Sequence, residues 1–305
     1  MRVSDVVDID RYPLNSPSDP AWSRTVERAR AQLAATGCAL IKEFITPSGL
    51  DNMVRESDTL WPHAHVSSRR FSPYPPYDAG GDQDRPDGHP RRFIADRTNR
   101  FLAYDQFADA SPVRQLYEWD CFREFIRHCL GISTIHPYGD PLGACTLSFQ
   151  EPGEALPWHF DQTHFIVSLL IVEPDEGGSF QYAPDLRSDA DENYPAVSAI
   201  LAGGSETVIE LDLRPGDLQI FKGRYALHRV TAPRGERRRC IALLSYCEEP
   251  GVIADEALQR DLFGRICRPG GRADDLSVRV DALEALSGAL IGRLFGAAAA
   301  EATSR

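Results

Sequence analysis

The sequence has no apolar run that approaches the length of a membrane-spanning helix, which needs about 20 residues. Its first residues, MRVSDVVD, lack the apolar core and the cleavage signature of a secretory leader. Both absences predict a soluble, cytoplasmic protein that does not bind membranes.

An excess of basic residues is also missing. The 305 residues include 33 Lys and Arg against 45 Asp and Glu, which gives a formal net charge of -12. Binding to nucleic acid or to an anionic membrane requires a basic surface. Both classes of partner are therefore excluded, and a small-molecule substrate is favoured.

Cysteine is present, but not in the spacing of structural sites. The seven cysteines are an odd number, lie far apart and include no C-x-x-C pair. This pattern argues against a disulfide framework and against a structural zinc site, so we expect reduced thiols. With 42% hydrophobic residues, the chain is long enough for one large β-rich domain, which we expect to span residues 1–305.

The first part of this domain, residues 1–142, is predicted to be helical. Helices are expected to begin at Asp19-Pro20, Thr46-Pro47 and Ser111-Pro112, because Asp, Thr and Ser cap helices and Pro suits the first turn. Between them, residues 62–100 show no periodicity and are rich in Pro, Gly and Arg. A loop of this length is either an active-site lid or a disordered segment.

Residues 143–250 read as short β-strands separated by Gly, Pro and Asp. They predict a mainly β fold with flanking helices, a double-stranded β-helix or jelly roll whose two sheets enclose a cavity. The acidic insert at residues 185–204 is either a solvated loop or part of a substrate-binding rim. Residues 251–305 are predicted to be helical, and the last helix either packs on the core or pairs with a second copy in a homodimer.

The segment WHFD carries the strongest candidate metal ligands. In an extended chain, residues i and i+2 face the same side, so His159 and Asp161 would point into one cavity. A third ligand must come from elsewhere, and His228 is the best placed candidate. Two imidazoles and one carboxylate form the facial triad of non-haem Fe(II) oxygenases.

Basic side chains follow the last candidate ligand in the segment ERRRC. A guanidinium group there would hold the distal carboxylate of 2-oxoglutarate through two parallel hydrogen bonds. Arg237 and Arg239 share one face if the strand has begun, whereas Arg238 points to the other. Thr146 and Ser148 alternate on an earlier strand, and their hydroxyl groups either bind the co-substrate or are satisfied within the core.

These motifs resemble those of the Fe(II)/2-oxoglutarate-dependent oxygenases, and within them the free-amino-acid halogenases of the lysine-chlorinating kind and their hydroxylase relatives. The resemblance covers about residues 37–265 and is strongest in the runs PWHFD at 157–161, DENY at 191–194, PGDL at 215–218 and LHRVT at 227–231. It implies a jelly-roll enzyme that uses Fe(II), 2-oxoglutarate and O2, with His159, Asp161 and His228 as metal ligands.

The resemblance also bears on the co-substrate and the substrate. Arg239 lies eleven residues after His228, a common interval in the superfamily, so it is the first choice for binding 2-oxoglutarate and Arg237 is the reserve. The implied substrate is a free L-amino acid, with basic ones such as lysine, ornithine or arginine as examples. The candidates for receiving a side-chain cation are Glu118, Asp120, Asp140 and Glu192.

One position departs from the halogenase pattern. Halogenases of this group have Gly or another non-ligating residue at the carboxylate position, and chloride binds the iron in the vacancy. Here Asp161 occupies that position. The resemblance therefore implies hydroxylation of an unactivated C–H bond rather than chlorination.

Other classes of protein share parts of this pattern. A cupin-like metalloenzyme that needs no 2-oxoglutarate would keep the metal ligands but would have no use for the arginine cluster. A non-catalytic jelly-roll binding protein would keep the fold without binding Fe(II). A halogenase would require Asp161 to leave the iron.

Overall fold

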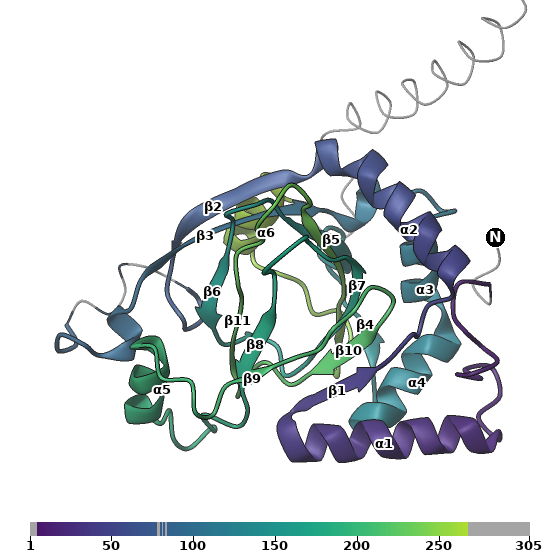
Figure 1. Ribbon diagram of the computed structural model, residues 1–305, viewed down its shortest axis with the longest axis horizontal. Coiled ribbons are helices and arrows are strands. Elements are labelled where there is room, and N and C mark those ends of the chain that lie inside the picture. The colour runs from purple at the N-terminus through teal and green to yellow at the C-terminus, as the bar shows by residue number, and fades with distance from the viewer. Residues whose placement is uncertain (1–4, 78–79, 81, 83, 268–305) are drawn as a thin grey trace, which may run out of the picture. The chain divides into compact units, whose positions relative to one another are not determined.

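Two antiparallel sheets form the double-stranded β-helix expected from the strand pattern (Figure 1). The computed structural model describes residues 5–77, 80, 82 and 84–267. The larger sheet has the order β1 (Cys38–Ile41), β10 (Leu218–Phe221), β7 (Ile166–Val172), β12 (Arg239–Leu244), β5 (Cys145–Gln150), β3 (Ala95–Leu102) and β2 (His65–Phe71). The smaller sheet has the order β6 (Leu156–His159), β11 (Leu227–Val230), β8 (Phe180–Ala183) and β9 (Ile209–Glu210). A further pair joins β4 (His136–Pro137) to β13 (Tyr246–Cys247).

Alternation along the strands of the larger sheet separates an apolar face from a polar one. Leu147, Phe149 and Val167 are fully buried in a core cluster shared with the N-terminal helices. Their neighbours in sequence, such as Ser148 and Ser168, point to the opposite face of the sheet. The helices therefore cover the apolar face, and the polar face lines the inside of the barrel.

Four helices pack on the apolar face, and the first three begin where the sequence predicts. Each of these starts with a proline and follows a side chain that accepts a backbone hydrogen bond. They are α1 (Pro20–Thr36, capped by Asp19), α2 (Pro47–Leu60, capped by Thr46) and α3 (Pro112–Glu118, capped by Ser111). α4 (Asp120–Leu130) follows α3 after a break at Trp119. Short 3-10 helices are η2 (Trp61–His63), η3 (Pro90–Arg92) and η4 (Tyr104–Gln106). None of the helices in the described part of the chain has the length and apolarity of a membrane span.

The expectation of an irregular segment at residues 62–100 is wrong at both ends. β2 and β3 pair antiparallel over seven register positions there, from His65 with Phe101 to Phe71 with Ala95. Asn99 and Phe101 share the face of Ser148, so this face lies inside the barrel and carries polar side chains. The two strands consequently lack the apolar alternation by which a strand is recognised.

The insert at residues 185–204 contains a helix instead of only a loop. α5 (Tyr194–Leu201) buries Val197 and Ile200 in a cluster with Trp158 and Phe160. These two aromatic residues flank His159 and point to the outer side of β6. Eight residues are too few for a helical periodicity to stand out in the sequence.

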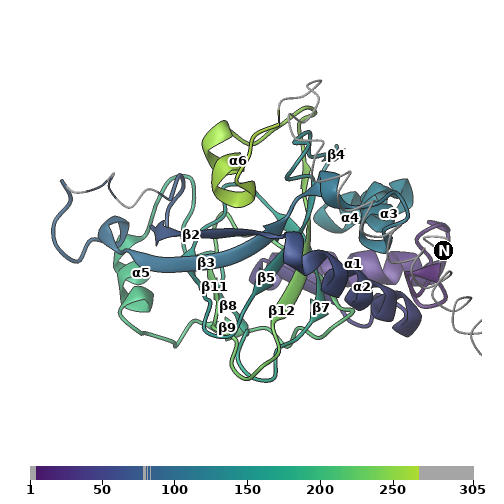
Figure 2. The ribbon, with the colours of Figure 1, turned by 90° about the horizontal axis from the view of Figure 1, so that it is seen from above.

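The chain returns over β2 and β3 as α6 (Glu256–Phe263), a helix that the sequence predicts (Figure 2). Asp140 is 1% exposed and accepts hydrogen bonds from Ala254 N at 3.0 Å and from Gln259 Nε2 at 2.7 Å. These bonds fix the start of the C-terminal arm. The expected last helix, with Leu283, Leu286, Leu290 and Leu294, lies outside the described residues.

A buried ion-pair cluster holds α6 to the inner face of the larger sheet. Both carboxylate oxygens of Asp261 lie 3.0 Å from Arg97 Nη2, and Oδ1 accepts a hydrogen bond from Ser67 Oγ at 2.7 Å. Arg69 Nε lies 3.3 Å from Oδ2. Arg97 is only 4% exposed, so this carboxylate neutralises a guanidinium group that water does not reach.

Asp261→Ala is therefore expected to lower the free energy of unfolding by about 3–5 kcal/mol, because it leaves the buried Arg97 without its acid. Urea unfolding followed by circular dichroism measures the change. The control is Arg260→Ala, an exposed position of the same helix, which should change the free energy by no more than about 0.5 kcal/mol. Equal losses in both variants would contradict the anchoring role of Asp261.

Candidate active site

His159 and His228 face each other across neighbouring strands of the smaller sheet. His159 is the last residue of β6, His228 is the second residue of β11, and the two are register partners. The centroids of their rings lie 4.0 Å apart. Asp161 follows β6, and its backbone N–H donates to Gly223 O at 3.0 Å. The fold thus brings together the three residues that the sequence suggests as metal ligands.

The Asp161 carboxylate faces both imidazoles. Oδ1 lies 3.3 Å from His228 Nε2 and 3.7 Å from His159 Nε2. One potential ligand atom from each residue lies within 4.8 Å of the others. The site therefore presents two nitrogen donors and one oxygen donor to a single point.

Backbone carbonyl groups set the orientation of both rings. His159 Nδ1 lies 2.8 Å from Pro157 O, and His228 Nδ1 lies 2.9 Å from Ala226 O. A carbonyl oxygen can only accept, so each Nδ1 carries a proton and donates it. The lone pair of the neutral ring is then on Nε2, the atom that faces Asp161.

The charge states of these residues suit metal binding. Burial, and after it the neighbouring His228 ring, lower the pKa of His159 to about 3, so the His159 imidazole is neutral at pH 7. Burial acts to raise the pKa of Asp161, but the two neighbouring imidazoles outweigh burial and hold this pKa below its usual value. Neutral imidazoles and ionised carboxylates are the forms that bind divalent metals.

One oxygen of Asp161 lacks a partner. Oδ2 is buried, and no donor in the described residues bonds to it. Burying a carboxylate oxygen without a donor is costly, and a divalent cation beside the carboxylate would offset that cost. Two imidazoles and one carboxylate with open positions fit non-haem Fe(II).

Aromatic rings enclose the two histidines. The centroid distances are 4.8 Å from Phe221 and 5.7 Å from Phe180 to His228, and 5.6 Å from Phe71 and 6.3 Å from Tyr77 to His159. Tyr77 donates its hydroxyl hydrogen to Phe160 O at 2.9 Å, and burial together with the charge of Asp161 raises the pKa of this phenol. Tyr77 therefore stays neutral and ties the segment after β2 to the strand of the ligands.

Arg239 begins β12 and is buried without an acidic partner. It is 3% exposed, and burial lowers its pKa to about 10. Nη1 lies 3.5 Å from Gln150 Oε1, the register partner on β5. No Asp or Glu among the described residues forms an ion pair with it. A buried cation of this kind needs an anion from outside the chain.

Arg239 lines a cavity of about 470 Å³. Phe180, whose ring adjoins His228, lines the same cavity, whereas the three candidate metal ligands are not among its lining residues. A side chain on Gly178 would meet Arg239, because its Cβ would lie 3.1 Å from Arg239 Cδ. Gly178 therefore leaves room for the aliphatic part of the Arg239 side chain and for Pro174, whose Cγ would lie 2.7 Å from the same Cβ.

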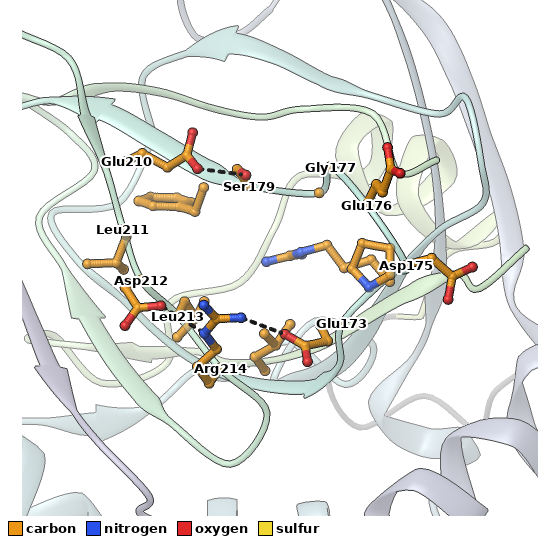
Figure 3. A pocket seen from close by; sticks show the side chains of 15 residues that line it. Glu173, Asp175, Glu176, Gly177, Ser179, Glu210, Leu211, Asp212, Leu213 and Arg214 are labelled. Carbon is orange, nitrogen blue, oxygen red and sulfur yellow. Dashed lines mark hydrogen bonds and ion pairs between the residues drawn. The ribbon is translucent and has the colours of Figure 1, made fainter. Parts of the chain in front are cut away.

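Acidic side chains also line this cavity, but each has a partner of its own. Figure 3 shows Glu173, Asp175, Glu176, Glu210 and Asp212 around it. Their partners are Arg214 for Glu173 and Asp212, Arg234 for Glu176, Ser179 and Gln181 for Glu210, and backbone N–H groups for Asp175. None of these acids forms an ion pair with Arg239, which is the buried cation among the residues that line this cavity.

The other two arginines of the cluster lie elsewhere. Arg238 pairs with Asp58 and stacks on the ring of Trp61 at 4.8 Å. Arg237 is exposed and lines a separate hollow of about 250 Å³. β12 begins only at Arg239, so the alternation expected for Arg237 does not apply to it.

Thr146 and Ser148 face the inside of the barrel but do not line the cavity of Arg239. The Ser148 hydroxyl accepts a hydrogen bond from Asn99 Nδ2 at 3.2 Å. Four residues near the site are not predicted from the sequence: Gln150, Gly178, Tyr77 and Arg97. Gln150 could have been found, because it lies two residues after Ser148 and therefore on the same face of the strand. No sequence pattern marks the other three.

Known proteins share parts of the sequence and the fold of this chain. A sequence model of halogenase D matches residues 95–258. No curated protein sequence matches. Among solved structures, the epimerase SnoN from nogalamycin biosynthesis has a TM-score of 0.52 at 16% identity, covering 82% of this chain and 95% of that one. The carbocyclase SnoK from the same biosynthesis has a TM-score of 0.52 at 14% identity, covering 82% and 96%.

A Trichoplax adhaerens prolyl hydroxylase has a TM-score of 0.50 at 16% identity, covering 77% of this chain and 97% of that one. At these identities the solved structures show the shared fold. The halogenase D match spans more than half of the 305 residues, including His159, Asp161, His228 and Arg239. On that match, this chain belongs to the halogenase D family.

Proposed function

We propose that this protein is an Fe(II)- and 2-oxoglutarate-dependent oxygenase that hydroxylates an unactivated C–H bond of a small molecule, a free amino acid. One observation carries the proposal. Within the described residues, one barrel holds a His-Asp-His cluster and a buried arginine without an acidic partner. The first fits the metal and the second fits a co-substrate carboxylate.

His159, Asp161 and His228 would hold the metal. Together with 2-oxoglutarate and O2, Fe(II) supplies the oxidant for C–H hydroxylation, while the 2-oxo acid is converted to succinate and CO2. The two backbone carbonyl groups that accept from the Nδ1 atoms keep both Nε2 lone pairs aimed at one point. The aromatic rings around the histidines exclude water from the reacting groups.

Arg239 would bind the distal carboxylate of 2-oxoglutarate. A guanidinium group offers two parallel donors to a carboxylate, and burial strengthens this interaction. Gln150 lies beside Arg239 and orients it. Arg237 lines a different hollow and is not part of this site.

Asp161 favours hydroxylation although the family is named for halogenation. Its carboxylate occupies the place in which halogenases of this group bind chloride. Oδ1 faces both Nε2 atoms in the described chain, so the position is not vacant. A halide would have to displace a carboxylate held by the fold.

The charges near the metal favour a substrate with a carboxylate. Arg97 and Arg69 share the single acid Asp261, and Arg97 Nε is buried without a partner among the described residues. Arg97 contacts the Phe71 ring at 5.3 Å, and that ring contacts His159. A substrate carboxylate would balance this positive charge.

The acidic residues expected to receive a basic side chain already have partners. Glu118 binds Tyr104 and Arg114, Asp120 binds Arg123, and Glu192 bridges Arg91 and Arg187. Asp140 accepts four hydrogen bonds from the chain. We therefore assign the substrate by its carboxylate and leave its side chain open.

Succinate release tests the function and the substrate class together. Anaerobically reconstituted protein receives Fe(II), 2-oxoglutarate, O2 and a panel of free L-amino acids or their carboxamides. We expect substrate-dependent succinate and a product heavier by one oxygen atom, with at least about 30-fold lower turnover on the matching carboxamide, because it cannot pair with Arg97. Equal turnover of acid and amide would refute carboxylate recognition, and turnover without 2-oxoglutarate would indicate the cupin-like class.

Asp161→Ala is expected to weaken metal binding by at least about 100-fold. Removing a residue that only hydrogen-bonds to a metal ligand already weakens metal binding by up to about 100-fold, and Asp161 is itself a proposed ligand. Calorimetric titration with Ni(II), which avoids oxidation, measures the affinity. His164→Ala is the matched control, since His164 is exposed and pairs with Glu248. Unchanged affinity in Asp161→Ala would remove this residue from the metal site.

Arg239→Gln is expected to raise the dissociation constant of 2-oxoglutarate at least about 30-fold, because truncating one partner of a buried charge pair costs about 2 kcal/mol or more. Thermal stability without 2-oxoglutarate should stay equal or rise, since the variant removes an unbalanced buried charge. Titration of the Ni(II)-loaded protein measures binding, and Arg237→Gln serves as the exposed control. A loss of stability without a loss of binding would make Arg239 a structural residue.

A further inference from the structure

Gly223 lies against the carboxylate of Asp161, in the connection between β10 and β11. A Cβ atom on Gly223 would lie 1.8 Å from Asp161 Oδ2, 2.5 Å from its Cγ and 3.0 Å from its Cβ. These separations are far below van der Waals contact. Gly223 also accepts the hydrogen bond from Asp161 N at 3.0 Å, so the backbones of the two residues are fixed to each other.

The backbone conformation of Gly223 does not explain the glycine. Eleven glycines of the described chain have a positive φ, and Gly223 is not among them. An L residue can therefore adopt its conformation without strain. The space taken by Asp161 is what excludes a side chain at this position.

The Asp161 side chain cannot move out of this space and still face the two histidines. Rotating the carboxylate would move Oδ2 away from a Cβ at position 223, but the Asp161 Cβ would still be 3.0 Å from it. Rotation would also carry Oδ1 away from the two Nε2 atoms, which lie 3.3 and 3.7 Å from it. A methyl group on residue 223 would thus cost the metal site its oxygen donor.

We propose that Gly223 is the residue that permits a metal-ligating carboxylate at position 161. Residues 161 and 223 form one steric unit: Asp161 requires Gly223, and a side chain at 223 is compatible only with a small residue at 161. Since a small residue there leaves a metal position open to an external anion, Gly223 takes part in selecting hydroxylation. This inference rests on the proposed metal site for its functional meaning, but the steric coupling can be measured without metal.

A double-mutant cycle tests the coupling. The four proteins are the unmodified chain, Gly223→Ala, Asp161→Gly and the double variant, each metal-free. Gly223→Ala should lower the melting temperature of the otherwise unmodified chain by about 2 °C or more, because it overpacks the site. In the Asp161→Gly background the same change should be neutral or raise the melting temperature, since alanine restricts the unfolded chain.

Ni(II) titration of the same four proteins gives the functional readout. Gly223→Ala should weaken Ni(II) binding by at least about 100-fold, to the level of Asp161→Gly. Adding Gly223→Ala to Asp161→Gly should change the affinity no further. Gly143→Ala is the matched control, because its φ is also ordinary and its Cβ would meet the nearest atom at 3.5 Å. It should leave both measurements unchanged in either background.

The outcomes separate this inference from the proposed function. Equal effects of Gly223→Ala in both backgrounds, or Ni(II) binding by Gly223→Ala as tight as in the unmodified chain, would overturn the coupling. If Gly223→Ala does not fold, a folded double variant supports the coupling, and an unfolded one refutes it. If the unmodified chain binds no Ni(II), the proposed metal site fails while the melting cycle still decides the steric claim.

Discussion

The antiparallel pairing of β6 with β11 is the constraint on which the site depends. It places His159 directly opposite His228, with the two rings 4.0 Å apart. A slip of one residue would turn one imidazole to the outer side of the sheet, where Trp158 and Phe160 pack against α5. The hydrophobic cluster on the outer side therefore fixes the register that brings the two ligands together on the inner side.

The inside of the barrel holds charges that the chain itself does not balance. Asp161 Oδ2 and Arg97 Nε are buried without partners, and Arg239 has no acidic partner, all within the described residues. Buried polar groups are normally satisfied, so each exception calls for an explanation, and a bound ion or ligand is one such explanation. Here the groups without partners differ in charge and in position. The negative one adjoins the imidazoles, and the positive ones are the groups that we propose to bind the carboxylates of the co-substrate and the substrate.

Local rules predict much of this structure. Caps and prolines locate the first three helices, alternation locates β5, and a continuous apolar run locates β7. β2 and β3 are not predicted because their inward side chains are polar. Polar side chains suit a binding cavity, whereas a core strand would show apolar ones. Strand alternation alone does not separate Arg239 from Arg237, and only the interval from His228 favours Arg239 in the sequence. Only the start of β12 decides that Arg239 points inward, and strand boundaries are the least predictable part of a strand.

Membership of the halogenase D family does not by itself determine the reaction, because the proposed difference lies in the few atoms of one carboxylate. The fold, the two histidines and the buried arginine would serve a halogenase as well as a hydroxylase, because none of them depends on the third ligand. The carboxylate of Asp161 makes the difference, and it fits only where residue 223 has no side chain. A family match over residues 95–258 therefore identifies the scaffold, whereas our proposal for the type of reaction rests on one contact within it.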